Sequence, residues 1–260
     1  MQIDFLGQDK ARLLYQTSLF DESGKVLKQR ASIDYSKANA FFQTLDAATI
    51  EAYKQHWSSL APKNDAERFQ KWLFSFMSVH TTYESNVRGY RLLKNWTSWF
   101  NLWDILAQKL TDSRAGLNKA RHPFIKAFAE HYWNNPDYYK KADNESWQQF
   151  RDRLEKRILG LGFAKVSFAI EMMYPNEAQV ACMDVHLYRL YGLDQSRDSA
   201  LGRTIEKHFV DMSRVWNCPP AIARAIMWDR QQKQGDSSYW TYVFNEAWHY
   251  PKQLILLIYD

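Results

Sequence analysis

Apolar side chains recur every three or four residues along most of this chain, which is the pattern of helices that bury one face. The clearest stretch follows Asn64 and Glu67, whose spacing is that of a capping box. Its apolar positions are Phe69, Trp72, Phe76, Val79, Tyr83, Val87 and Tyr90. The pattern predicts one long helix, or two helices separated by a break near residue 80.

Weaker helical patterns lie on both sides of this stretch. Residues 38–60 predict one or two short helices, and the apolar residues from Trp99 to Leu110 predict another. Residues 111–122 are expected to form a loop. Pro123 then suits the first turn of a further helix, which should end at the sequence Asn-Asn-Pro-Asp at residues 134–137.

A short break that contains two glycines separates the next two predicted helices. Ser146 and Gln149 form a second capping-box signature ahead of the first helix. The second helix is indicated by apolar residues from Val166 to Met173. Between them stands Gly-Leu-Gly at residues 160–162, and glycine allows the sharp turn that joins two helices closely.

The two ends of the chain complete the prediction. Residues 199–215 and 221–232 are expected to be helical, with Asn-Cys-Pro-Pro as the break between them. Residues 12–33 instead predict a β-hairpin, because two strand-like runs flank Asp-Glu-Ser-Gly, a sequence that favours a turn. The fold class expected is mainly α, with a small N-terminal β-hairpin.

Composition limits the kinds of protein that this chain can be. Hydrophobic residues make up 46% of the 260 residues and aromatic residues 16%, which is typical of a globular protein with a large core rather than a disordered one. Cys182 and Cys218 are too few and too far apart for a disulfide scaffold or a four-thiolate cluster. We therefore expect no metal and no cofactor.

Charge and hydropathy bear on the partners of the protein. The net charge of +5 suits a nucleic-acid partner but does not require one. The first residues hold no long apolar run, and no window approaches the roughly 18 apolar residues of a membrane helix. The expectation is a cytoplasmic monomer with no membrane partner.

The glycine break is a candidate anion site. Amides at the start of the second helix, near Gly160, Gly162, Ala164 and Lys165, would be unpaired and could hold a DNA phosphate. The alternative is a plain turn between two helices, which such a sequence forms more often. Asp184 follows in Met-Asp-Val-His, where it could act on a bound nucleotide or cap a helix.

The segment from Leu159 resembles the helix-hairpin-helix DNA glycosylase superfamily. That family has a pattern similar to LPGVGxKxA followed by VDxHVxR, and this chain has Leu-Gly-Leu-Gly at 159–162 and Met-Asp-Val-His-Leu-Tyr-Arg at 183–189. Residues 74–93 and 116–132 also resemble family segments, in the family's order. The resemblance covers roughly residues 66–232.

The resemblance implies a helical fold of two subdomains with a cleft between them. Residues 1–65 would form the N-terminal hairpin and helices, packing on the second subdomain. Residues 66–198 would hold the helical core, with the helix-hairpin-helix at about 145–175, and residues 199–260 would complete the cleft. The implied partner is double-stranded DNA, from which one modified base is flipped into the cleft and excised.

The resemblance assigns the catalytic carboxylate to Asp184. A carboxylate there can stabilise the positive charge that develops on the sugar as the glycosidic bond breaks, and can orient the attacking water. Members that also cut the strand carry a lysine where this chain has Ala164. Lys165 is the next residue and is an alternative catalytic lysine or a phosphate contact. We therefore expect a monofunctional enzyme.

Other site residues are implied less directly. His186 would donate to a phosphate, and His80 would fill the vacated stack or touch the base. Asn118 and Lys119 lie where a loop could contact the DNA backbone. Stacking and polar contacts that read the flipped base are expected from Trp72, Tyr83, Trp228 and Asp229.

The N-terminal hairpin and the helix after the glycines look most like a phage-associated branch of this superfamily. That similarity implies glucosylated hydroxymethylcytosine of phage DNA as the preferred substrate, removed in defence against phage. One alternative is a transferase of the same fold that elaborates hydroxymethyluracil in DNA. A second alternative is a DNA-binding module without catalysis.

Overall fold

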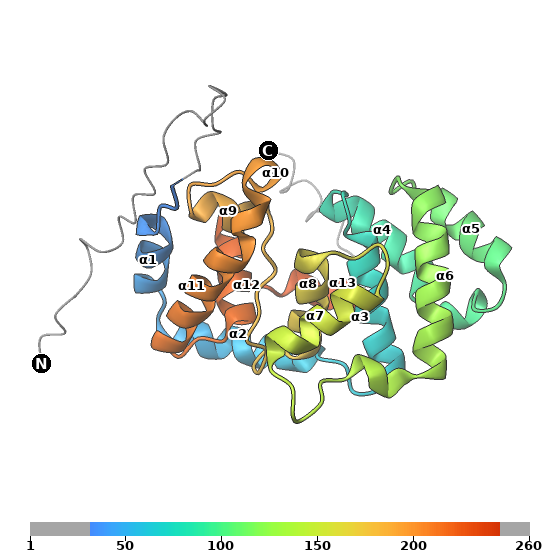
Figure 1. The fold of residues 1–260 in the computed structure, drawn as a ribbon, viewed down its shortest axis with the longest axis horizontal. Coiled ribbons are helices and arrows are strands. Elements are labelled where there is room, and N and C mark those ends of the chain that lie inside the picture. Colours follow the sequence, from blue (N-terminus) through green and yellow to red (C-terminus); the bar gives the residue numbers. More distant parts are fainter. Residues whose placement is uncertain (1–31, 245–260) are drawn as a thin grey trace, which may run out of the picture. The chain divides into compact units, whose positions relative to one another are not determined.

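The computed structural model describes residues 32–244, and every regular element in that range is helical. All of these helices belong to the unit that begins at Ile33 (Figure 1). In chain order the helices are α1 (Ser36–Gln43), α2 (Ala47–Leu60), α3 (Asp65–Met77), α4 (Tyr83–Leu93), α5 (Trp103–Asp112), α6 (Asn118–Asn134), α7 (Trp147–Arg157), α8 (Phe163–Met173), α9 (Val185–Leu190), α10 (Gln195–Asp198), α11 (Gly202–Val215), α12 (Pro220–Gln231) and α13 (Tyr239–Phe244).

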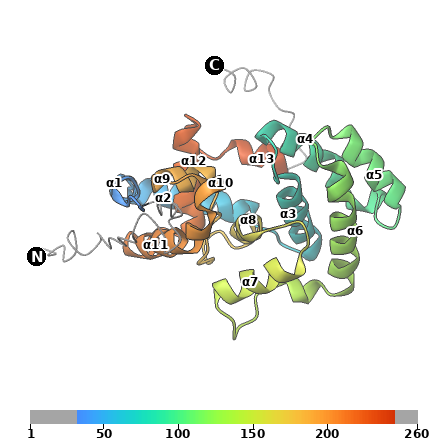
Figure 2. The same ribbon diagram turned by 45° about the horizontal axis from the view of Figure 1, so that its top comes forward.

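One group of helices is built around α3. This helix packs against α4, α6 and α8, while α5 lies on α4 and α6, and α7 on α8 (Figures 1 and 2). Phe69 of α3 stacks parallel to Phe128 of α6, with 5.6 Å between ring centroids. Both rings are buried, so the aromatic residues of this group form a continuous core that fixes α3 in position.

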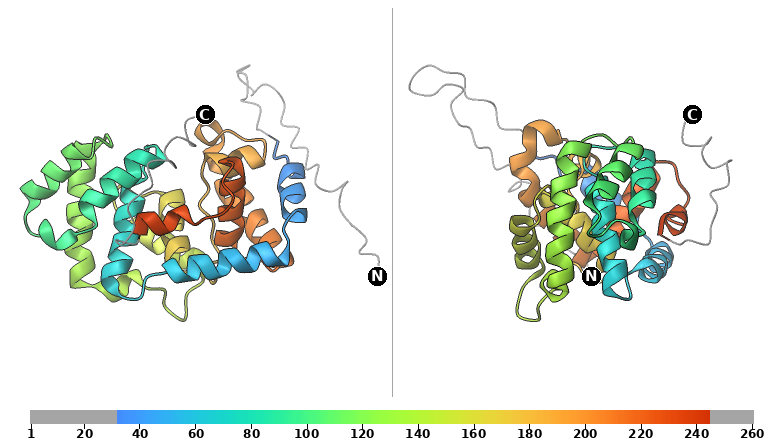
Figure 3. Two further views of the ribbon diagram at one scale, coloured as in Figure 1. Left: turned by 180° about the vertical axis from the view of Figure 1, so that it is seen from behind. Right: turned by 90° about the vertical axis from the view of Figure 1, so that its right-hand side faces the viewer.

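A second group consists of α1, α2, α11 and α12. Helix α2 packs on α12, α11 packs on both α12 and α1, and the chain passes from α2 directly into α3 (Figure 3). Helices α9 and α10 lie next to each other and lead into α11. The part of residues 1–65 that the structure describes therefore packs on helices of the C-terminal part of the chain.

Local sequence accounts for the helix boundaries. The side chains of Asn64 and Ser146 accept hydrogen bonds from the backbone amides of Glu67 and Gln149, so both predicted caps are confirmed. The capping box is complete at Ser146, whose own amide donates to Gln149. The predicted break near residue 80 is also confirmed, because α3 ends at Met77 and α4 starts at Tyr83.

Three predictions of local structure need correction. The loop predicted for residues 111–122 is shorter, since α6 already begins at Asn118 and carries Pro123 inside it. Leu117, directly before α6, adopts a left-handed conformation with a φ of 52°. The helix therefore starts before the position that was predicted from Pro123 in its first turn. Helix α5 starts only at Trp103, and α11 only at Gly202 after a short 3-10 turn.

Some expectations lie beyond what the structure describes. Most of the hairpin predicted for residues 12–33 falls outside residues 32–244, and the domain boundaries at residues 65 and 198 stay predictions. Within residues 32–244, none of the helices combines the length and the apolar character needed to cross a bilayer.

Candidate active site

A cavity of about 410 Å³ lies where the two groups of helices meet. Such a volume is within the range of roughly 300–1,000 Å³ that small-molecule sites occupy. The start of α4, helices α8 and α12, and the loop before α9 all contribute to its walls. Its lining includes Trp57, Thr81, Thr82, Tyr83, Asn86, Lys165, Phe168, Cys182, Asp184, His186, Arg224, Trp228, Asp229 and Trp240.

Asp184 caps helix α9 at the edge of this cavity. Its Oδ1 accepts hydrogen bonds from the backbone amides of His186, at 2.9 Å, and Leu187, at 3.1 Å. The other oxygen, Oδ2, lies 3.6 Å from Nη1 of Arg224. The capping hydrogen bonds therefore use Oδ1 alone, while Oδ2 pairs with Arg224 and the residue as a whole lines the cavity.

A buried ion pair stands behind Asp184. Nε of Arg224 donates to Oε2 of Glu171 at 2.7 Å, and Oε1 of Glu171 accepts from the amide of Cys182 at 2.8 Å. Burial raises the pKa of Glu171, and Arg224 opposes that rise. Because Arg224 is anchored by Glu171, its second nitrogen is held in a defined position beside Asp184.

Cys182, two residues before Asp184, is a buried thiol. It lines the cavity, but burial raises the pKa of its thiol to about 12. A thiol needs its thiolate form to attack an electrophile, and this one is neutral at neutral pH. Asp184, Lys165 and His186 are among the other ionisable residues that line the cavity.

The glycine break forms the tight connection between α7 and α8. Gly160 has a φ of +87°, and Gly162 is the residue directly before α8, with its backbone extended. Both glycines are exposed, and Lys165 lies in the first turn of α8. Ser75 of α3 donates to the carbonyl oxygen of Lys165 at 2.6 Å. This bond ties the start of α8 to the core.

Aromatic rings form much of the cavity wall. The ring of Tyr83 lies 6.2 Å from that of Trp228 and 5.6 Å from that of Trp240. Trp57 in turn lies 5.5 Å from Trp240. Trp228 is partly exposed whereas Trp57 and Trp240 are buried. Such a wall can hold a planar ring by stacking and apolar contact.

Asp229 contributes a buried acid to the same wall. Its oxygens accept hydrogen bonds from the hydroxyls of Tyr53, Ser237 and Tyr239, at 3.0, 2.5 and 2.5 Å. Burial raises its pKa, although the three hydroxyls act in the opposite direction. With these donors engaged, the main role of Asp229 is to fix the end of α12 and the segment that leads to α13.

The structure brings together six of the residues singled out from sequence. Lys165, Asp184, His186, Tyr83, Trp228 and Asp229 all line the cavity. Trp72 does not, and its assignment to the base pocket is corrected. Its side chain is fully buried on the core side of α3, against Phe128 and Tyr139.

The remaining residues lie near the surface, outside the cavity lining. His80 is exposed in the connection between α3 and α4, with a φ of 49°. Two other residues of that connection, Ser78 and Thr81, do line the cavity. Asn118 and Lys119 begin helix α6, where Lys119 is exposed, and Ala164 lies beside Lys165 in α8.

Trp57, Trp240, Glu171 and Arg224 are among the residues of this site that sequence reasoning missed. Trp57 and Trp240 carried no signal, because eleven tryptophans in one chain are indistinguishable without their packing. Glu171 and Arg224 are 53 residues apart, so no local pattern pairs them. One signal was available for this pair. Glu171 and Arg224 each stand within an apolar helical stretch, and a charged residue in such a place is buried only when it is paired.

We expect Gly160→Ala to lower the free energy of unfolding. The positive φ alone costs about 1–2 kcal/mol for a residue with a Cβ, and the new methyl group would overlap the ring of Phe124. Gly162→Ala is the matched control, since nothing lies within 4 Å of the place that its methyl group would take and its φ is not positive. Urea titrations of both variants check this, and equal midpoints for the two would contradict it.

Solved structures of other proteins have a fold similar to that of this chain, although sequence comparisons find no match. No protein-family model and no curated protein sequence matches the chain. The 8-oxoguanine DNA glycosylase of Methanocaldococcus jannaschii is similar in structure, with a TM-score of 0.59 and 19% identity, over 75% of this chain and 94% of that one.

Two further solved structures agree. A complex of the Methanocaldococcus jannaschii glycosylase/lyase with a 15mer DNA containing 8-oxoguanine has a TM-score of 0.58 and 18% identity, over 76% of this chain and 97% of that chain. The 8-oxoguanine DNA glycosylase of Thermotoga maritima has a TM-score of 0.55 and 15% identity, over 78% and 94%. This chain therefore has a fold similar to that of 8-oxoguanine DNA glycosylases.

Proposed function

We propose that this protein is a DNA glycosylase, which flips a modified base out of duplex DNA and hydrolyses its N-glycosidic bond. The observation that carries the proposal is the position of Asp184. Its carboxylate lines an aromatic cavity that also contains Lys165, the third residue after the glycine loop. The fold in which this occurs is similar to three solved structures of DNA glycosylases.

Each part of the site has a proposed role. The exposed glycines and the amides of α8 that precede Lys165 bind a phosphate of the DNA backbone, aided by the helix dipole, whereas the amide of Lys165, expected to be unpaired, donates to the carbonyl of Gly162. Tyr83 and Trp228 stack on the flipped base. Oδ2 of Asp184, which lies 3.6 Å from Nη1 of Arg224, faces the sugar in this proposal, where it stabilises developing positive charge and orients the attacking water. His186 and Lys119 contact phosphates, as does Asn118.

The exposed loop between α3 and α4 is proposed to enter the duplex. His80 is exposed there, next to Thr81 and Ser78, which line the cavity. A side chain in this position can fill the space that the flipped nucleotide leaves, and can offset part of the cost of unstacking. His80→Gly should weaken binding to DNA that carries a substrate base more than binding to plain duplex.

For the substrate we propose glucosylated hydroxymethylcytosine, with phage defence as its context. The proposal starts from the resemblance of the helix after the glycines to a phage-associated branch, and a cavity of about 410 Å³ leaves room for a substituted base. The structurally similar proteins are 8-oxoguanine DNA glycosylases. That lesion is accordingly the comparison substrate in any test.

The position of Lys165 favours a second candidate, a glycosylase that also cuts the strand. Its side chain lines the cavity that contains Asp184. In this mechanism the neutral amine attacks C1′ of the sugar and the base leaves with one amine proton. The C1′–O4′ bond then breaks, O4′ takes the second amine proton, and an imine links enzyme and sugar. A glycosylase that uses water forms no such link. Ala164 agrees with that mechanism, because it stands where the strand-cutting members of the family have their lysine.

The test uses duplexes that each carry one modified base, including glucosylated hydroxymethylcytosine and 8-oxoguanine. We expect abasic sites to accumulate in one substrate while the strand stays intact until alkali is added. A covalent complex trapped by borohydride, and lost in Lys165→Gln, would support the second candidate instead. If no modified duplex acquires abasic sites, the glycosylase proposal is wrong.

A further inference from the structure

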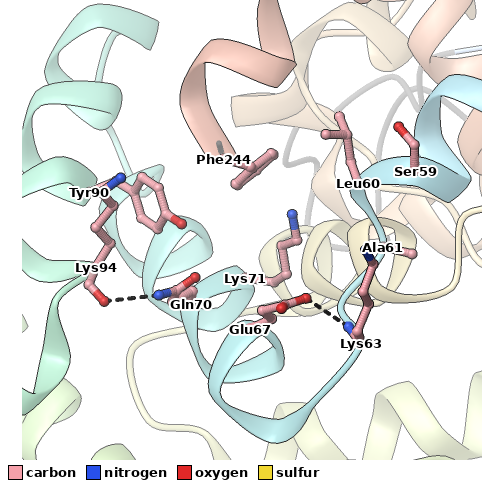
Figure 4. Close-up of a pocket in the computed structure, with 10 residues that line it drawn as sticks. All are labelled: Ser59, Leu60, Ala61, Lys63, Glu67, Gln70, Lys71, Tyr90, Lys94 and Phe244. Atoms are coloured by element: carbon pink, nitrogen blue, oxygen red, sulfur yellow. Dashed lines mark hydrogen bonds between the residues drawn. The ribbon is translucent and has the colours of Figure 1, made fainter. Parts of the chain in front are cut away.

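A second cavity, of about 350 Å³, lies apart from the candidate active site and shares none of its lining residues. It is formed by the end of α2, the segment that follows it, α3, α4 and the end of α13 (Figure 4). Its lining residues are Ser59, Leu60, Ala61, Lys63, Glu67, Gln70, Lys71, Tyr90, Lys94 and Phe244.

Lys71 is the unusual residue of this cavity. Its side chain is only 4% exposed, and its Nζ lies 3.2 Å from the centroid of the Phe244 ring. Figure 4 shows the amine pointing from α3 into the space between Phe244 and Leu60. Among the described residues it forms no ion pair and no hydrogen bond, so its contact with the ring is its one polar interaction there.

Such an arrangement is costly for a residue with only a structural role. A buried ammonium group is normally paired with an acid, or its stem is buried while the amine reaches water. Burial lowers the pKa of Lys71 to about 7, and Glu67 opposes this shift only from a distance. The amine therefore changes charge easily in the neutral range, and no acid within residues 32–244 pairs with it.

The charges around the cavity favour a negative occupant. Lys63 and Lys94 line it together with Lys71, while Glu67 is the one acid among the described residues that line it. The carboxylate of Glu67 is engaged at the start of α3, where it accepts from the amide of Lys63 at 2.8 Å and from the side chain of Asn64 at 3.0 Å. Tyr90 completes the ionisable groups that face the space.

We propose that this cavity binds a small molecule through a phosphate or carboxylate group, with Lys71 as the counter-charge of that oxyanion. The ligand supplies the ion pair that the buried amine lacks among the described residues. Phe244 and Tyr90 offer apolar surface to the rest of the ligand. Binding holds Lys71 in its ammonium form, so that a proton is taken up when the ligand enters near neutral pH.

The test is isothermal titration of the full-length protein with inorganic phosphate, deoxyadenosine 5′-monophosphate and benzoate. These probes separate phosphate from carboxylate recognition. We expect saturable binding of one class, and a heat that changes with the ionisation enthalpy of the buffer at pH 7, as proton uptake requires. Lys71→Met keeps an unbranched apolar stem but removes the amine, and should weaken binding about tenfold or more, the effect of one lost charged hydrogen bond.

Lys207→Met is the control, because this lysine is exposed on α11 and pairs with Asp211. Should Lys71→Met fail to fold, ¹³C-lysine spectra of the unaltered protein give the same answer, since at a fixed, mildly alkaline pH only bound ligand moves the Lys71 signal to its ammonium position. The proposal is wrong if no probe binds at concentrations up to about 10 mM. It is equally wrong if Lys71→Met binds as tightly as the unaltered protein.

Discussion

Replacing Asp184 by asparagine is expected to lower the single-turnover rate of base excision by about 10²–10³-fold, the effect of removing one preorganised electrostatic group from a transition state. Asparagine caps helices as well as aspartate does, so α9 and its bonds to His186 and Leu187 should persist. DNA affinity should be unchanged or higher, because a negative charge near phosphates is removed.

Asp194→Asn is the matched control for this experiment. Asp194 caps α10 through the amides of Ser196 and Arg197, just as Asp184 caps α9, but it is exposed and does not line the cavity. We expect it to excise at the normal rate. Equal losses in both variants would mean that Asp184 acts only as a helix cap.

Arg224→Met is expected to lower the free energy of unfolding by about 3–5 kcal/mol, since removing one partner leaves the other charge buried alone. Glu171 would keep its bond from the Cys182 amide but lose its cation. Urea denaturation measures the effect. Arg203→Met is the control, because this arginine is largely exposed in its pair with Asp152 and should cost less than about 1 kcal/mol.

A double variant shows whether the buried charge is the cause. Glu171→Gln combined with Arg224→Met removes both charges and keeps an amide oxygen for the Cys182 amide. It should regain most of the stability lost in Arg224→Met alone. If Arg224→Met is as stable as the unaltered protein, the ion pair of Arg224 and Glu171 does not stabilise the fold. Slower excision by the double variant would show that the ion pair also positions Asp184.

Much of the fold was predictable because it depends on local sequence. Helices α3, α7 and α8 follow from apolar spacing and from the caps at Asn64 and Ser146, which are local signals. The start of α6 was not predictable, because the left-handed backbone of Leu117 leaves no mark in the sequence. The helix therefore begins five residues before the proline that suggested its first turn.

The site was predictable only where chemistry and motif coincide. Asp184 and Lys165 stand in a pattern around the glycines, and the structure brings both to one cavity. Trp72 and Trp240 differ only in tertiary packing, which places the first in the core and the second in the cavity wall. Arg224 likewise acts through a partner distant in sequence, so periodicity cannot reveal it.

Mass spectrometry of the material released from modified DNA tests the central claim most directly. The unaltered protein and Asp194→Asn should both release the free modified base, and Asp184→Asn should release little or none. A transferase of the same fold would leave the base in the DNA with an added group, and a binding module would leave the DNA unchanged. Either of those results, or normal release by Asp184→Asn, would contradict hydrolysis assisted by Asp184.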